Sequence, residues 1–141
     1  MIYLNFKTNF FFGKKKKNYL IDAKNKILGR LSSNIIKLLM NKNNYLYTPN
    51  YNNINKIIII NANKIKFKPK KIYYKYTGYI GNKKKFFAID LFKKNPSILL
   101  KLSINRMLPK NLLGKYAKKN ILIYSNNKFN NKITNLIKYK I

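Results

Sequence analysis

The residues that could carry out acid–base, nucleophilic or metal chemistry are almost absent from this chain. It contains no histidine and no cysteine, and its only acidic residues are Asp22 and Asp90. Zinc, iron and copper sites would lack their usual ligands, and a paired-carboxylate mechanism would require two residues far apart in the sequence to converge. We therefore expect neither an enzyme nor a metal or cofactor site, and no small-molecule substrate.

The chemistry that the chain does offer is cationic. Thirty-two lysine and arginine residues give 141 residues a formal net charge of +30, and arginine occurs only at Arg30 and Arg106. A folded domain with this charge repels itself unless a polyanion supplies counter-charge, and nucleic-acid phosphates exchange condensed cations for lysines. Hydrophobic residues make up 46% of the chain, too many for a disordered basic tail. We therefore expect a folded domain that binds nucleic acid.

One candidate binding segment, residues 75–85, mixes lysines, tyrosines and two glycines. Glycine lets a backbone approach a phosphate closely, and tyrosine can stack on an unpaired base or bond to a ribose. A surface loop whose tyrosines pack inward fits the same composition equally well. The candidate RNA-binding residues of this segment are Lys75, Tyr76, Thr77, Gly78, Tyr79, Gly81, Lys83, Lys84 and Lys85.

A second candidate binding segment, residues 106–115, is predicted to contain the end of one helix, a break and the start of another helix. Pro109 disfavours helical backbone at Leu108, so the chain should turn a rigid corner there. Such a corner can hold several cations in fixed geometry, although an ordinary helix–helix connection would look similar. Its candidate RNA-binding residues are Arg106, Lys110, Lys115 and Lys118. Candidates elsewhere are the charge run Lys14, Lys15, Lys16 and Lys17, Lys42, and Arg30 at a predicted helix start that would attract anions.

The elements that must position these residues alternate between strand and helix. The run of four isoleucines at 57–60 is apolar on both faces, as in a buried parallel strand. This order predicts a single α/β domain with a mostly parallel sheet of about four strands flanked by helices. The expected strands are 19–23, 57–60 and 121–124, the expected helices are 29–40, 96–107 and 112–119, and residues 64–88 form a long loop with strand character at 72–74.

Three regions are expected along the chain. Residues 1–18 form a basic N-terminal extension, residues 19–125 the domain, and residues 126–141 an Asn/Lys-rich C-terminal tail. No apolar run approaches the roughly 18 residues of a membrane span, so we expect no membrane partner. The preference for Lys, Asn, Ile, Phe and Tyr, which have AT-rich codons, indicates an AT-rich genome.

Several stretches, in this order, resemble one protein family. They include IDAKNKILGRLSSNIIKLL (21–39), YTP (47–49), YYKYTGYIG (73–81), NPSILLKLSINRMLPKN (95–111) and LGK (113–115). Together they are similar to the bacterial-type large-subunit ribosomal protein thirteen family of bacteria, mitochondria and plastids. The RMLPKN and TGYIG stretches are specific, whereas the strands are merely compatible.

The resemblance implies a structural, non-catalytic constituent of the large ribosomal subunit that binds large-subunit rRNA beside neighbouring ribosomal proteins and supports assembly. It implies a ribosome in the cytoplasm of an AT-rich bacterium, a mitochondrion or a plastid. By similarity, an RNA-facing loop contains Lys75, Thr77, Gly78, Tyr79 and Gly81, and an RNA-facing corner contains Arg106, Pro109, Lys110 and Gly114. The chain departs from the family after Pro49 and at Tyr76, where the family usually has histidine.

Two alternative functions are compatible with part of the sequence. A basic nucleic-acid-compacting protein would share the electrostatics, but it would give no reason for the RMLPKN corner. An interfacial membrane protein needs one strongly amphipathic cationic helix, and the strands of buried type at 57–60 and 121–124 argue against it.

Overall fold

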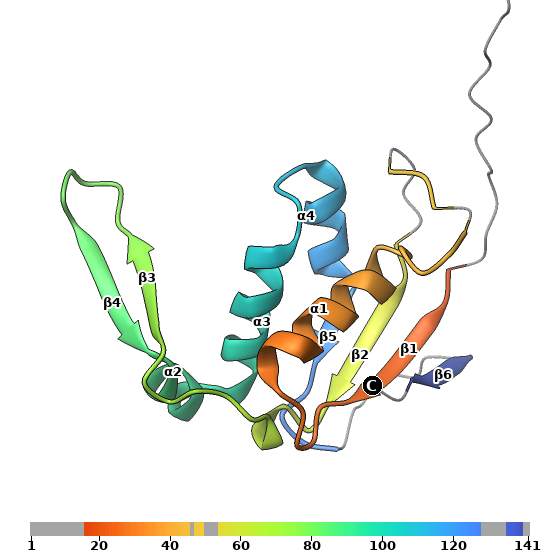
Figure 1. Cartoon of the computed structure of the whole chain (residues 1–141), viewed down its shortest axis with the longest axis horizontal. Helices are drawn as coiled ribbons and strands as arrows, with labels where there is room; N and C mark the ends of the chain where they lie inside the picture. Colours follow the sequence, from red (N-terminus) through yellow and green to blue (C-terminus); the bar gives the residue numbers. More distant parts are fainter. Residues whose placement is uncertain (1–15, 46, 50–53, 128–134, 140–141) are drawn as a thin grey trace, which may run out of the picture.

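Parallel strands form the central sheet of the computed structural model, which describes residues 16–45, 47–49, 54–127 and 135–139. Within that part of the chain the sheet has four strands, in the order β5-β2-β1-β6 (Figure 1). The predicted α/β class and parallel sheet are confirmed. The strands are β1 (Asn18–Asp22), β2 (Lys56–Ile60), β5 (Ile121–Ile123) and β6 (Leu136–Tyr139).

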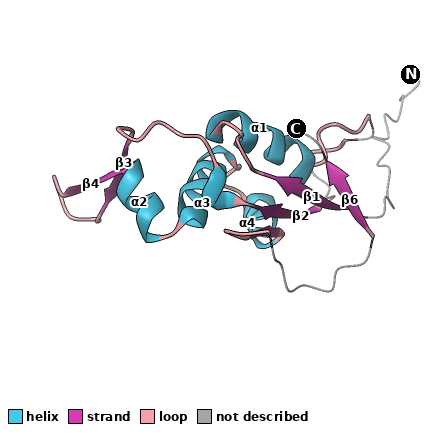
Figure 2. Ribbon diagram, turned by 90° about the horizontal axis from the view of Figure 1, so that it is seen from below, coloured by secondary structure: helices cyan, strands magenta, loops and turns pink. Residues whose placement is uncertain are grey.

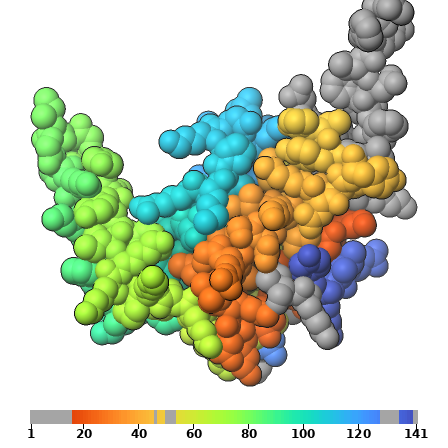
Figure 3. All heavy atoms as spheres, in the orientation of Figure 1, coloured from red at the N-terminus to blue at the C-terminus, as the bar shows by residue number. Residues whose placement is uncertain are grey.

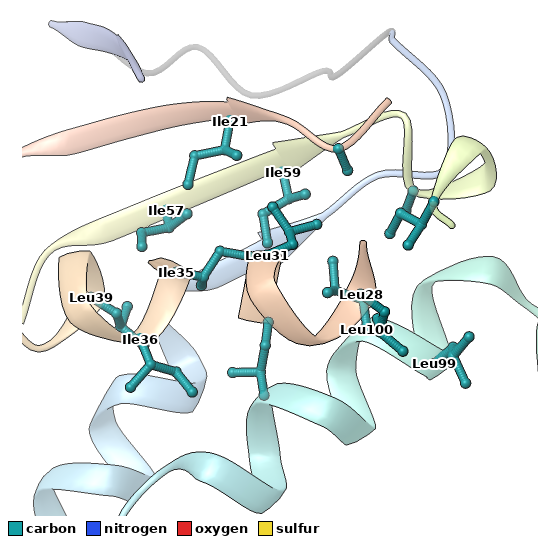
Figure 4. Packing of buried hydrophobic residues seen from close by; sticks show 14 of the residues in the cluster. Ile21, Leu28, Leu31, Ile35, Ile36, Leu39, Ile57, Ile59, Leu99 and Leu100 are labelled. Atoms are coloured by element: carbon teal, nitrogen blue, oxygen red, sulfur yellow. The ribbon is translucent and has the colours of Figure 1, made fainter. Parts of the chain in front are cut away.

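The core lies between the sheet and two helices. The four isoleucines of β2 are all buried, which confirms the prediction made from their unbroken apolar run. Helix α1 (Leu28–Leu39) places Leu31 and Ile35 against Ile57 and Ile59 of the sheet, and α3 (Pro96–Met107) closes the same cluster (Figure 4). Burial of these aliphatic side chains supplies the main favourable free energy of folding.

Asparagine side chains and backbones define several helix ends. Asn95 caps α3 by accepting a hydrogen bond from the Ser97 amide at 2.9 Å, as its position before Pro96 predicts. Asn111 caps α4 (Leu112–Lys119) in the same way, from the Gly114 amide. At the end of α1, Asn41 adopts a left-handed backbone with φ of 57°, a conformation that asparagine tolerates better than most residues.

Two buried polar side chains tie the elements together. The Ser32 hydroxyl donates to the Leu28 carbonyl and contacts the Ser103 hydroxyl of α3 at 2.9 Å. Asn55 accepts from the Lys17 amide and donates to the Leu38 carbonyl at 2.7 Å, so it joins the start of β1 to the end of α1. Their hydrogen bonds offset the cost of burying polar atoms.

The chain differs from the sequence-based expectation at both edges of the sheet. Residues 121–123 form a half-buried edge strand, β5, instead of a fully buried strand. At the opposite edge, β6 pairs in parallel with β1, so part of the expected C-terminal tail belongs to the sheet. Tyr139 of β6 packs edge-on against Tyr19, with ring centroids 6.1 Å apart.

The largest difference lies in residues 64–88, for which the sequence predicts a long loop with strand character at 72–74; only that strand character is confirmed. The structure has a short 3-10 helix, η1 (Ala62–Lys64), and an antiparallel hairpin of β3 (Ile72–Tyr76) and β4 (Lys83–Phe87). Helix α2 (Ala88–Lys94), which the sequence did not indicate, leads from the hairpin to α3. The hairpin is a separate two-stranded sheet at one end of the molecule (Figures 1 and 2). Across the described residues, no helix has the length and apolar character to cross a membrane.

Candidate nucleic-acid interface

The hairpin carries most of the residues of the first candidate segment. Its six-residue loop, 77–82, is held by the Thr77 amide and hydroxyl, which both donate to the Asn82 carbonyl at 3.3 and 3.2 Å. Gly78 and Gly81 have φ of 97° and 71°, a backbone that disfavours any side chain, and the space around both is open. The predicted glycine positions are therefore required by the turn itself.

One face of the hairpin presents tyrosines and lysines to solvent. Strand pairing places Lys83 opposite Tyr76 and diagonal to Tyr74. The Lys83 ammonium lies 3.8 Å from the Tyr74 ring centroid and 5.5 Å from that of Tyr76. Tyr76 is 73% exposed and Tyr79, in the loop, is 80% exposed. The alternative in which the loop tyrosines pack inward is therefore wrong for these two residues. The exposed tyrosine rings and the Lys83 ammonium group form one accessible surface.

The other face of the hairpin is attached to α3. Tyr73 is buried, and the Arg106 guanidinium lies 4.7 Å from its ring centroid. Arg106 also donates to the Tyr74 carbonyl at 3.3 Å. Burial raises the pKa of Tyr73, and the Arg106 charge opposes that rise. Arg106 thus fastens β3 to the end of α3, a role that its position in the sequence did not reveal.

The predicted corner between α3 and α4 is rigid. Leu108 is buried with extended backbone, and the Asn111 cap starts α4 immediately afterwards. Gly114 packs directly on the Pro109 carbonyl group, and a Cβ atom at this position would overlap it. The corner borders a cavity of about 170 Å³ whose lining includes Lys110, Lys115 and Lys118. Three of the predicted cations therefore converge, whereas Arg106 faces the hairpin instead.

The hairpin and the corner flank an open recess. Figure 3 shows the hairpin standing away from α3 and α4, with the molecule hollowed between them. The hairpin loop and the corner lie on the same side of the molecule (Figure 1). A ligand that entered the recess would meet hairpin residues on one wall and residues of the two helices on the other.

The remaining predicted residues lie elsewhere. Lys16 and Lys17 are exposed at the start of β1, while Lys14 and Lys15 fall outside the described residues. Lys42 is exposed just after α1. Arg30 is exposed in the first turn of α1, at the end of the sheet where β1 and β2 finish. The structure does not bring these positions together with the hairpin or the corner.

The sequence-based candidates omitted one group of cations. Lys24 and Lys26 lie in the turn after β1, beside Lys64 and Lys66, through backbone hydrogen bonds between the two segments. The signal that could have revealed them is the alternation of lysine with apolar residues over 64–68. Among the described residues, no group of three or more acidic, histidine or cysteine side chains could hold a metal ion.

The amino-acid sequence is similar to those of known ribosomal proteins. The sequence profile of the family described as "Ribosomal protein L13" matches residues 16–130. The "Large ribosomal subunit protein uL13" of Thermosipho africanus is 44% identical over 115 residues, which cover 79% of this chain and 77% of that protein. The proteins of the same name from Wigglesworthia glossinidia brevipalpis and Buchnera aphidicola are 40% and 38% identical, over 79% and 86% of this chain and 82% and 87% of theirs. The chain therefore belongs to the ribosomal protein L13 family, whose members are structural proteins of the large ribosomal subunit and not enzymes.

Proposed function

We propose that this chain binds large-subunit rRNA through the β3–β4 hairpin, the α3–α4 corner and the recess between them, and thereby supports the assembly of the large ribosomal subunit. The observation that carries the proposal is the hairpin itself. All five residues of β4 are exposed, as are Tyr76 and Tyr79, so packing within the domain does not account for these side chains.

The hairpin and the corner would contribute differently to binding. On the hairpin face turned away from α3, the Tyr74 and Tyr76 rings offer stacking surfaces for unpaired bases, and Lys83 places a cation beside them for the adjoining phosphate. Strand alternation puts Lys75 and Lys84 on the same face as Tyr73, where they border the recess. At the corner, Lys110, Lys115 and Lys118 provide a fixed set of charges for a folded RNA backbone. Arg106 acts on binding indirectly, because it holds the hairpin at its angle to α3.

The place of action is the ribosome, and the partners are rRNA and neighbouring ribosomal proteins. The matched relatives named above come from bacteria, which favours a ribosome of bacterial type. The expected basic extension at residues 1–18 would add further cations to the RNA contact.

A competition experiment separates this proposal from a general DNA-compacting role. Full-length protein bound to labelled large-subunit rRNA is challenged with unlabelled duplex DNA of equal phosphate concentration. We expect the DNA to compete poorly at 150 mM salt, because the recess recognises a folded RNA shape with unpaired bases. Equal competition by rRNA and duplex DNA would instead support the compacting role.

A further inference from the structure

We propose that the domain has a second RNA-binding surface at the carboxyl-end edge of its sheet, so that it joins two separate segments of rRNA. This inference rests on the proposed function, because it concerns the same partner. The surface, called here the basic edge, combines the turn after β1 with the extended segment after η1. Its residues are Lys24, Lys26, Lys64, Lys66 and Lys68.

Backbone hydrogen bonds hold the two parts of the basic edge together. The Asn25 amide donates to the Lys64 carbonyl, and the Lys66 amide donates to the Lys26 carbonyl, both at 2.9 Å. The Leu28 amide donates to the Lys66 carbonyl, also at 2.9 Å. The backbone positions of these lysines are thus determined by tertiary structure, unlike those of a charge run in a free loop.

Alternation along the second segment directs its lysines outward. Ile65 is buried, and the Phe67 ring packs on Phe92 of α2 with centroids 4.7 Å apart. The lysines at 64, 66 and 68 are all exposed. In an extended chain, every second residue is separated by about 7 Å. That separation is close to the distance between successive phosphates of a nucleic-acid strand, so the row suits a polyanionic backbone.

The basic edge keeps a strong positive charge despite one neighbouring carboxylate. Burial raises the pKa of Asp22, but hydrogen bonds from Asn61 and the Lys24 amide and the charges of Lys24 and Lys64 outweigh this effect and lower it. Asp22 is therefore ionised at neutral pH, and this single negative charge lies beside the charges of Lys24 and Lys64 in a group of five lysines. Ligands of open parallel sheets characteristically bind outside the carboxyl ends of the strands, where this edge lies.

The position of the basic edge implies that the domain bridges two RNA segments. In Figure 1 the turn after β1 and the chain from η1 toward β3 run along the lower border of the molecule. The hairpin loop and the α3–α4 corner point toward the upper border, with the sheet and core helices between them. An RNA segment in the recess would therefore be distinct from one lying on the basic edge.

Directed hydroxyl-radical cleavage tests this inference, and the absence of cysteine makes the chain well suited to it. Single-cysteine variants Lys68→Cys and Lys110→Cys are tethered to an iron chelate and incorporated, as full-length protein, into large subunits. The untreated cysteine-free protein provides the background. We expect Lys68→Cys to cut a segment of rRNA that Lys110→Cys does not cut.

The other outcomes have separate meanings. Cleavage from position 110 alone would overturn the basic edge as an RNA surface and leave the proposed function standing, whereas no cleavage from either position would overturn both. Cleavage of the same nucleotides from both positions would overturn the bridge. Cleavage of a neighbouring protein but of no rRNA from position 68 would overturn the basic edge as an RNA surface and assign it to a protein partner.

A binding measurement gives an independent readout. The variant Lys64→Gln/Lys66→Gln/Lys68→Gln should bind large-subunit rRNA with a log–log salt slope flatter by about 2 to 3, because each lost phosphate contact removes about 0.7 to 0.9 from the slope. Circular dichroism shows whether the variant is folded. An unchanged slope in a folded variant would contradict the inference.

Discussion

Strands β2 and β4 have the same length and opposite surroundings. The four isoleucines of β2 are buried on both faces of the sheet, whereas every residue of β4, three lysines and two phenylalanines, is exposed. Packing explains the four isoleucines of β2, since each of these side chains lies in the core. Packing does not explain those of β4. The comparison therefore separates a strand that stabilises the domain from one whose residues are available to a partner.

The largest loss of stability should result from a substitution in the buried strand β2. Ile59→Asp places an unpaired charge in the core and should remove more than about 4 kcal/mol, most or all of the free energy of unfolding of a small domain. Urea denaturation measures the effect. The matched control is Ile80→Asp in the hairpin loop, where the side chain is fully exposed and we expect almost no change. A folded Ile59→Asp protein would refute the role assigned to β2.

The next largest effect should occur where the corner is tightly packed. Gly114→Ala forces a Cβ atom against the Pro109 carbonyl and should destabilise the domain by about 1 to 3 kcal/mol. Gly29→Ala in α1 is the matched control, because nothing lies near that position and alanine favours a helix by up to about 1 kcal/mol. Thermal denaturation of both variants should show shifts of opposite sign. Equal shifts in the denaturation temperatures of the two variants would mean that the α3–α4 corner can move to accommodate the added Cβ atom.

A smaller effect is expected where the hairpin joins α3. Arg106→Ala removes the guanidinium from the Tyr73 ring and should cost about 0.5 to 1 kcal/mol. Hydrogen exchange should accelerate in β3 and β4 and stay unchanged in β1 and β2. Lys101→Ala, an exposed position on the same helix, serves as the control. Uniform acceleration across the domain would show that Arg106 supports the core instead of the hairpin.

The smallest change in stability should follow from altering the exposed strand. The variant Lys83→Gln/Lys84→Gln/Lys85→Gln should unfold within about 0.5 kcal/mol of the unaltered protein, as exposed substitutions usually do. Chemical denaturation measures this directly. A loss of several kcal/mol would show that β4 stabilises the domain, and the contrast with β2 would disappear.

The same contrast explains which parts of the fold could be predicted. Strand β2, helix α1 and helix α3 follow from apolar periodicity and capping residues, because burial dictates those residue types. Only the strand character at 72–74 of the hairpin was predicted. The pairing partner β4 was not, because all five of its residues are exposed and set no apolar pattern. Strand β6 was not predicted because its four residues carry no strand pattern of their own. They form a strand by pairing with β1, which lies more than a hundred residues away in the sequence.

The candidate site shows a similar division. The glycines of the hairpin loop and the lysines of the corner were predicted, since both lie in compact motifs. The contact between Arg106 and Tyr73 joins residues from separate elements, so no local sequence pattern predicts it. Likewise, the lysines of the basic edge become one group only when backbone hydrogen bonds bring the two segments together.

The salt dependence of rRNA binding tests the central claim most directly. Full-length protein, the triple variant of Lys83, Lys84 and Lys85, and a control with equal charge are compared over 50 to about 300 mM salt. The control replaces Lys37, Lys93 and Lys138, exposed lysines on α1, α2 and β6, with glutamine. The hairpin variant should bind more weakly than the control, with a log–log slope flatter than that of the unaltered protein by about 2 to 3. Equal affinities and equal slopes for the two variants would contradict the assignment of the hairpin to RNA binding.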